Sequence, residues 1–584
     1  MNERTKTGLQ ILQVAVIVGL LGDVLLRAMP WGLNVLLFNA AFAAGMIMLL
    51  RRRAPEYLTR YTMVLFGALI FFASMFVWRD SIELRLADTA AIITILSVLF
   101  LPRMKVATQA AGVFHYFLAF LWSAFNAAFA PAAVLAADID WKTIPQSGWS
   151  RHLFSVLRGL AIATPILLIF GALFVAADAV YAGWIQRVFN IRPETLFTHA
   201  LLISIFSWLS AGYLRGILIR PAASSDAAAE MSPVPPRAET DADASKVERV
   251  RAESGEYPVT LPGDRSVVEH LNISDPPDAP DKSFETRSAE PAKWDWAKIE
   301  NTILPPAFTL GTVEVGVILG LINLLFLSFV IVQVPYLFGG MELVQNTPDF
   351  KLAEYARRGF GELVAVSALV LPILLVSHWL VRKENALTER LFRILAGVQI
   401  ALLFVIMASA IQRLVLLTGD LGYGLTTIRL YPMIFMMWLA VVFVWFSLTV
   451  LRGARKHFAW GALWSAFLIL GATHVLNPDE FIVKTNIALA EQGREFDADY
   501  NSNLSDDALP VLLHSFESLT AADQQTAIRR IATRYCKMRD EGDLRSWNLS
   551  RSRAAKMLNS NEEWVREIGD CDVNPVVYPH HRDF

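Results

Sequence analysis

Cysteine is scarce in this chain, and neither sign of charge dominates. The 584 residues include only two cysteines, Cys536 and Cys571, and both lie in the polar region after residue 476. They allow either one disulfide, which requires an oxidising compartment, or two free thiols. The formal net charge is −2, and no block of Lys and Arg occurs. We therefore expect no nucleic-acid partner.

The common enzymatic motifs are also missing. The chain has no P-loop, no HExxH, no CxxC and no nucleophile elbow. The glycine-rich stretch Gly419–Gly424 does not follow a strand and is typical of a turn between membrane helices. His378 and His474 are lone histidines in apolar runs, without a second ligand at metal-binding spacing. The sequence predicts no catalytic residue, no metal and no cofactor, and it favours a non-enzymatic role.

What the sequence has instead is long apolar runs. Apolar residues make up 54% of the chain, and the mean hydropathy is +0.42. A membrane-spanning helix needs roughly 20 mostly apolar residues, and continuous rather than alternating runs favour helices over strands. We therefore predict an all-α fold, a polytopic transmembrane helical bundle of about 11 spans and at most about 13. The runs are Leu9–Leu26, Leu33–Leu50, Tyr61–Val77, Ala87–Leu101, Gly159–Ala177, Phe197–Ile217, Leu310–Val332, Leu363–Val381, Ile394–Leu416, Met433–Val450 and Ala459–Val475.

The composition divides the chain into four parts. Residues 1–219 form a first membrane block, and residues 305–476 form a second. Between them, residues 220–304 are rich in Pro, Ala, Ser, Asp and Glu, which predicts a disordered polar linker. Residues 477–584 are long enough for a small soluble domain.

Helix signals recur in this soluble region. Ser505–Asp507 precede an apolar pattern and are expected to cap a helix over Ala508–Phe516. Thr520 and Asp523 resemble a capping box that opens a helix over Ala521–Met538, and Asn561 marks a third start. Leu509, Leu512, Leu513 and Phe516 share one face, so we expect a helical packing domain rather than a catalytic one.

The short loops suggest an orientation. Arg51–Arg53, Arg103, Lys105 and the start of the chain are basic, and so are two loops of the second block. The positive-inside rule places these loops inside and the C-terminal domain outside. The run Ala107–Ala137 is apolar enough to cross. Crossing would place several arginines outside, however, so an interfacial or re-entrant helix fits the charges better.

Polar residues gather on one predicted membrane face. Counting spans places the loops at 338–360 and 418–429 and the Asn477–Asp479 turn on the same side, with Trp78–Asp80. Arginine binds phosphate or carboxylate through paired hydrogen bonds, so these loops are candidates for an anion site. Mutual ion pairs that tie the loops together are the alternative. The candidate site residues are Arg357, Arg358, Glu362, Asp420, Tyr423, Arg429 and Asp479.

Two acids lie inside predicted spans, where charge is costly. Asp23 is one helical turn before Arg27, so an ion pair between them is expected. Glu314 lies near the start of its span, and interfacial placement is favoured over a proton relay.

Several short motifs resemble a bacterial membrane family. They include Gly22–Arg27 with Pro30–Asn34, Trp78–Ser81, Tyr336–Gly340, Glu354–Phe360 and Leu476–Asp479. Together they resemble the proteins called domain of unknown function 4173, which are close to the set numbered 4153. The resemblance covers both membrane blocks but not the 220–304 linker. It implies a polytopic bacterial membrane protein and supplies no activity, ligand or catalytic residue.

Three hypotheses for function follow. The first is a multi-pass protein of the bacterial inner membrane, with an extracytoplasmic C-terminal domain and a polar outer face that binds an anionic group. Its partners would be membrane lipid, an anionic lipid or another envelope component. The second is a transporter or channel lined by Asp23, Glu314 and the arginines, although no paired broken helices occur. The third is a membrane enzyme that acts on a lipid-linked phosphate.

Overall fold

The computed structural model describes residues 2–141, 193–219, 310–338, 360–381, 386–418, 424–454, 457–540 and 543–560. All structural statements below concern these residues, which belong to one compact unit. The predicted span Gly159–Ala177, the 220–304 linker, the helix start at Asn561 and Cys571 lie outside them.

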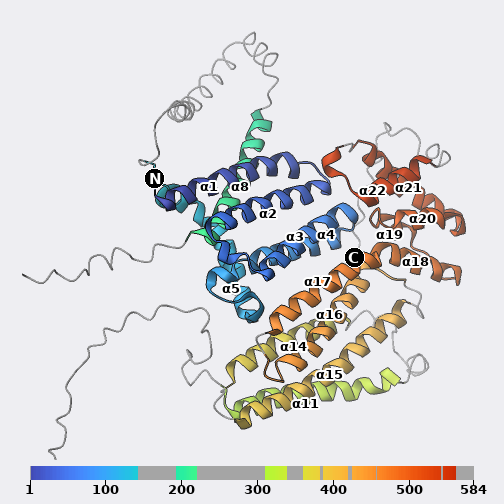
Figure 1. Cartoon of the computed structure of the whole chain (residues 1–584). Coiled ribbons are helices and arrows are strands. Elements are labelled where there is room, and N and C mark those ends of the chain that lie inside the picture. The colour runs from blue at the N-terminus through green and yellow to red at the C-terminus, as the bar shows by residue number, and fades with distance from the viewer. Residues whose placement is uncertain are drawn as a thin grey trace, which may run out of the picture. The chain divides into compact units, whose positions relative to one another are not determined.

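The first membrane block is an antiparallel series of long helices (Figure 1). Helices α1, α2, α3 and α4 are joined by short turns and pack in sequence order. Helix α8 packs along α1, where Gly19 and Gly22 allow close approach. The bounds are α1 Glu3–Leu26, α2 Leu33–Arg53, α3 Arg60–Trp78, α4 Ile82–Val98 and α8 Pro193–Leu218.

Helix α5 (Val113–Ala133) begins and ends at the same end of this bundle. It starts soon after the end of α4, and Tyr116 donates a hydrogen bond to the Thr108 carbonyl at 3.2 Å. Just after its end, Asp138 pairs with Arg4, at the start of α1, at 2.7 Å. The start of α1 lies beside the ends of α2 and α8 at this same end of the bundle. We name it the far end, because the C-terminal helices described below lie at the opposite end. The placement of α5 agrees with an interfacial or re-entrant helix.

The second membrane block contributes five helices in the described ranges. The starts of α11 and α15 meet at Thr312 and Thr388, whose hydroxyls are 2.6 Å apart. Helix α17 lies against the first block, where Phe467 contacts Phe72 with ring centroids 5.0 Å apart. The bounds are α11 Thr312–Phe338, α14 Phe360–Leu380, α15 Ala386–Thr418, α16 Thr427–Thr449 and α17 Phe458–Leu476.

The C-terminal region forms a small helical layer opposite the far end. Its core is apolar, and the predicted face is confirmed in part: Leu509 and Leu512 are buried, and Leu513 and Phe516 are half-buried. The predicted helix start at Thr520 is confirmed, because the Thr520 hydroxyl accepts a hydrogen bond from the Asp523 amide, at 3.3 Å. The helices are α18 Pro478–Glu491, α19 Ala498–Asn503, α20 Leu509–His514, α21 Ala521–Asp540 and α22 Leu549–Ser560. We call residues 477–560 the tail layer.

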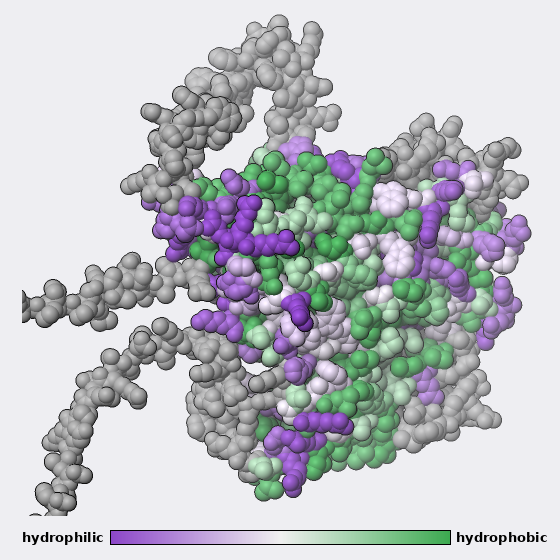
Figure 2. Space-filling model, in the orientation of Figure 1, coloured by the Kyte–Doolittle hydropathy of each residue, from purple (hydrophilic) through white to green (hydrophobic). Residues whose placement is uncertain are grey.

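The all-α, multi-pass class is confirmed. Eleven helices in the described ranges are long and apolar enough to span a membrane. Ten match predicted runs, and the eleventh is Val113–Asp138. In Figure 2, hydrophobic residues cover much of the visible membrane-helix surface, and hydrophilic residues gather at the far end and on the tail layer.

The contact between α5 and α8 gives a stability prediction. A Cβ at Gly212 would lie 2.3 Å from the Asn126 carbonyl oxygen and 2.7 Å from that of Ala127. Gly212→Leu should therefore force the two helices apart and cost roughly 1–3 kcal/mol. The check is thermal unfolding of the purified protein in detergent. Gly67→Leu, at a position with no neighbour within 4 Å, is the matched control. Equal stability of the two variants would contradict this packing.

Candidate functional site

The turn between α3 and α4 is held by one buried carboxylate of the tail layer. Asp507 accepts hydrogen bonds from the backbone amides of Asp80, at 2.7 Å, and Ser81, at 3.1 Å. It also pairs with Arg79, at 3.4 Å, and accepts a hydrogen bond from the Ser550 hydroxyl. Its side chain is 0% exposed. The tail layer is thus bonded directly to the membrane helices.

Other polar groups complete this junction. The Asn548 amide donates to the carbonyls of Phe76 and Arg79, both at 2.8 Å, and so caps the end of α3. The Arg79 guanidinium also donates to the His474 carbonyl, at 2.9 Å, which joins α17 to the same turn. The two membrane blocks and the tail layer therefore meet at one end of the bundle, which we name the tail end.

A polar cavity of about 480 Å³ opens at the tail end. It is lined by residues of α4, α16, α18, α19, α21 and α22 and of the loops between them. Its ionisable lining consists of four carboxylates and three guanidinium groups, which gives a net negative charge. These groups are Asp80, Glu83, Asp479, Asp506, Arg85, Arg534 and Arg551.

The three arginines of this polar cavity form ion pairs with acids, and some also donate hydrogen bonds to backbone carbonyls. Arg85 and Arg551 both pair with Asp80, the latter at 3.5 Å. Arg534 pairs with Asp506, at 3.3 Å, and also donates to the Ser502 carbonyl, at 3.1 Å. Burial raises the pKa of Asp80 and raises that of Asp506 to about 6, and the neighbouring arginines oppose both shifts. These pairs tie loops together, as the alternative interpretation of the arginines predicts.

Asp479 is different, because it has no cationic partner among the described residues. One of its oxygens, Oδ2, accepts from the Ser505 amide, at 3.2 Å, and from the Ser505 hydroxyl. The other, Oδ1, is buried without a hydrogen-bond partner, and the residue is only 2% exposed. Burial, with the nearby charges of Glu83 and Asp507, raises the pKa of Asp479 to about 6, against the effect of Ser505. An unpaired buried carboxylate that faces a cavity marks a candidate binding site.

Two acid–histidine pairs lie within the membrane helices. His474 of α17 contacts Asp88 of α4, with Nε2 and Oδ2 3.0 Å apart, and both side chains are buried. Asp23 of α1 contacts His199 of α8, at 2.5 Å. The predicted ion pair between Asp23 and Arg27 is wrong, because Asp23 turns toward α8 instead. His474 is a satisfied core histidine, bonded at both ring nitrogens. The described residues contain no cluster that could hold a metal ion.

The structure brings together only some of the predicted site residues. Asp479 lines the polar cavity, whereas Arg429 donates to the Gly424 carbonyl nearby and does not line it. Glu362 is exposed in the first turn of α14, and Glu314 is exposed in the first turn of α11, as an interfacial acid would be. Arg357, Arg358, Asp420 and Tyr423 lie outside the described residues. The anion site remains a prediction.

The sequence does not predict several residues of the polar cavity and of the junction beside it. It predicts that Asp506 and Asp507 cap a helix, but both are buried and bonded to other elements. The helix after them is also shorter than expected, and ends at His514. Arg534 and Arg551 look like ordinary surface residues of amphipathic helices. The one available signal was Trp78–Ser81, a polar turn between two spans that needs partners for its amides.

With this geometry in place, comparison with known proteins gives the family. The model of the family described as "Domain of unknown function (DUF4153)" matches residues 66–242 and 284–514, more than half of the chain. The chain belongs to this family. The relation to domain of unknown function 4173 remains a prediction. A comparison with curated proteins finds no match, and a comparison with solved structures finds none either.

Asp479 and Asp507 should affect stability with opposite signs. The folded-state pKa of Asp479, about 6, lies above the usual value, so ionisation of its carboxyl costs stability as pH rises from about 4 to about 6. Asp479→Asn should raise the free energy of unfolding at pH 7 by roughly 2 kcal/mol. This gain should shrink as pH falls toward 4, where the native carboxyl is protonated. Asp507→Asn should instead lower it by roughly 3–5 kcal/mol, because it breaks a buried ion pair.

Thermal unfolding of both variants between pH 4 and pH 7 tests these signs. A loss of stability for Asp479→Asn at pH 7 would mean that the carboxylate is a structural partner. In that event the candidate site would lose its basis.

Proposed function

We propose that this chain is a non-enzymatic integral membrane protein that binds a ligand's cationic group in the polar cavity. The observation that supports this is Asp479, which lines the cavity and whose buried Oδ1 has no hydrogen-bond partner in the described part of the chain. Glu83 lines the same cavity and has no ion-pair partner in the described ranges. An ammonium group placed between Asp479 and Glu83 would satisfy both carboxylates.

An anionic ligand is supported less well. Each arginine of the cavity already pairs with an aspartate, with Arg85 and Arg551 sharing Asp80, and Arg551 also donates to the Trp31 carbonyl, at 3.3 Å. An anion would have to displace these partners, and it would meet a cavity with net negative charge. The two cavity carboxylates without a cationic partner among the described residues, Asp479 and Glu83, therefore favour a positively charged ligand.

We also propose that the tail end faces outward from the bacterial inner membrane. The far end carries Arg4, Arg51–Arg53, Arg103 and Arg215, and the described tail-end turns of the first block are less basic. This distribution follows the positive-inside rule. The polar cavity would then open to the extracytoplasmic side, where it meets envelope molecules.

Reporter fusions test this orientation. Alkaline phosphatase fused after Phe584 should be active, and the same enzyme inserted between Pro55 and Glu56, in the turn between α2 and α3, should be inactive. Green fluorescent protein at the two positions should give the opposite result. The reverse pattern would place the cavity in the cytoplasm.

Ligand binding tests the proposed function itself. Glycerophosphoethanolamine, a soluble molecule with an ammonium group, should bind the purified full chain in calorimetry. Asp479→Asn should weaken binding at least about tenfold, as expected for a lost charge-assisted contact. Binding should also weaken as pH falls below about 6, because Asp479 becomes protonated.

Asp499→Asn is the matched control, because Asp499 forms an exposed pair with Arg530 away from the cavity. It should bind the probe as the native chain does. Glycerol 3-phosphate, which lacks the amine, should not bind. Equal binding of both probes, or full binding by Asp479→Asn, would contradict the proposal.

A further inference from the structure

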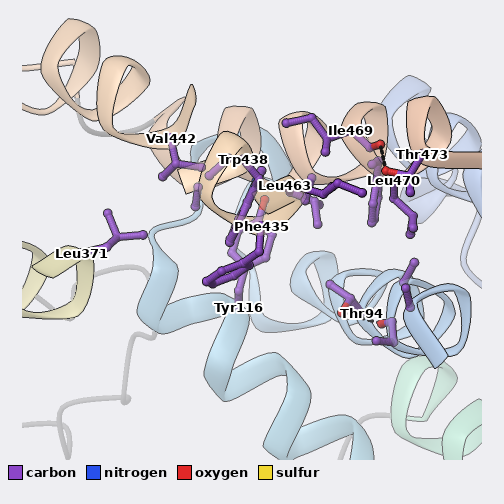
Figure 3. A pocket seen from close by; sticks show the side chains of 18 of the residues that line it. Thr94, Tyr116, Leu371, Phe435, Trp438, Val442, Leu463, Ile469, Leu470 and Thr473 are labelled. Atoms are coloured by element: carbon purple, nitrogen blue, oxygen red, sulfur yellow. Dashed lines mark hydrogen bonds between the residues drawn. The ribbon is translucent and has the colours of Figure 1, made fainter. Parts of the chain in front are cut away.

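A second hollow, the apolar groove, lies among the membrane helices. It has a volume of about 530 Å³ and is lined by residues of α4, α5, α14, α16 and α17. Figure 3 shows Phe435 and Trp438 of α16 near Tyr116 of α5, with Thr94 of α4 on another wall and Leu371 of α14 at one side. Its volume falls within the ~300–1,000 Å³ typical of small-molecule sites. The lining is almost entirely apolar, which suits a hydrocarbon chain.

The apolar groove and the polar cavity share the same helix faces. On α4, Glu83 lines the polar cavity, and Ala87, Ala90 and Thr94 line the groove. These positions are spaced i, i+4, i+7 and i+11, so they form one stripe. On α16, Thr427 lines the polar cavity, and the groove residues Tyr431, Phe435, Trp438 and Val442 continue its stripe. The two hollows therefore adjoin along two helices.

The boundary between the two hollows is polar. The Tyr431 hydroxyl lies 3.2 Å from that of Ser81, and the Ser81 hydroxyl donates to Glu83, at 3.0 Å. Asp479 lies close enough to Tyr431 and Glu83 to interact electrostatically with both. The two carboxylates without cationic partners thus lie where the groove meets the cavity.

The groove is long enough for an acyl chain. Its lining on α16, from Tyr431 to Val442, rises about 16 Å, and its lining on α17, from Phe458 to Thr473, rises about 22 Å, at ~1.5 Å per residue. Either length is at least about half of the ~30 Å hydrocarbon core of a bilayer. The polar cavity lies beyond the Tyr431 end of the groove, at the tail end.

We infer that the ligand is a membrane lipid with an amine-bearing headgroup, whose acyl chain lies in the apolar groove and whose ammonium contacts Asp479 and Glu83. This inference rests on the proposed function and adds the chemical class of the ligand. An anionic lipid fits less well, because the polar cavity already carries net negative charge. A soluble amine would leave the groove empty.

Native mass spectrometry of the full chain tests the inference. Phosphatidylethanolamine should be retained at least about tenfold better than phosphatidylglycerol with the same acyl chains. Ala466→Phe places a ring in the groove from α17 and should reduce this retention about tenfold or more. Ala87→Phe does the same from α4, and serves as a second variant if either folds poorly.

Ala472→Phe is the matched control, since Ala472 lies on α17, is exposed and does not line the groove. It should retain lipid as the native chain does. Ala466→Phe should still bind glycerophosphoethanolamine, because the polar cavity is unchanged. Equal retention of the two lipids, or full retention by both groove variants, would overturn the lipid inference and leave only non-selective annular lipid. If the soluble probe also failed to bind the native chain, the proposed function itself would fail.

Discussion

The buried carboxylate of Asp507 is the interaction on which the rest of this architecture depends. The turn between α3 and α4 is too short to satisfy its own amides, and Asp507 supplies the missing acceptor from more than 400 residues away. It also neutralises Arg79, which in turn reaches the end of α17. One side chain thus joins both membrane blocks to the tail layer. Without that carboxylate, the turn that carries Asp80 into the polar cavity would lose the acceptor of its amides.

The sequence was a good guide wherever local periodicity decides the structure. Runs of about 20 apolar residues specify spanning helices because hydrocarbon offers the backbone no other partners, and span counting then placed Asp479 on the same face as Trp78–Asp80. The arginines could not be chosen in this way. Arg534 and Arg551 belong to tail helices whose surface pattern is ordinary, and only tertiary packing turns them toward Asp506 and Asp80. Contacts between segments that are distant in the sequence produce no periodic pattern in it.

Helix α5 shows how two sequence signals conflict and which of them agrees with the structure. Its hydropathy alone makes it a candidate span, whereas the arginines that follow it favour a helix that does not cross. Asp138, just after the end of α5, forms ion pairs with Arg4 and Arg215 at the far end, which agrees with a helix that does not cross. An acid placed between two arginines holds the end of α5 on the side where it began. The charge pattern, rather than hydropathy alone, therefore predicts where the end of α5 lies.

Asp479 and Asp507 are close neighbours in the structure, and the contrast between them bears on function. Asp507 has enough donors to compensate for its burial, whereas Asp479 has only Ser505 and carries a raised pKa as a result. Folding alone would favour a neutral residue at position 479, because an amide oxygen would accept the same hydrogen bonds without the cost of burying a charge. A carboxylate that weakens the fold is explained if a ligand supplies the missing positive charge. A lipid amine arriving along the apolar groove would do so, and its binding would then relieve a cost that the empty site carries.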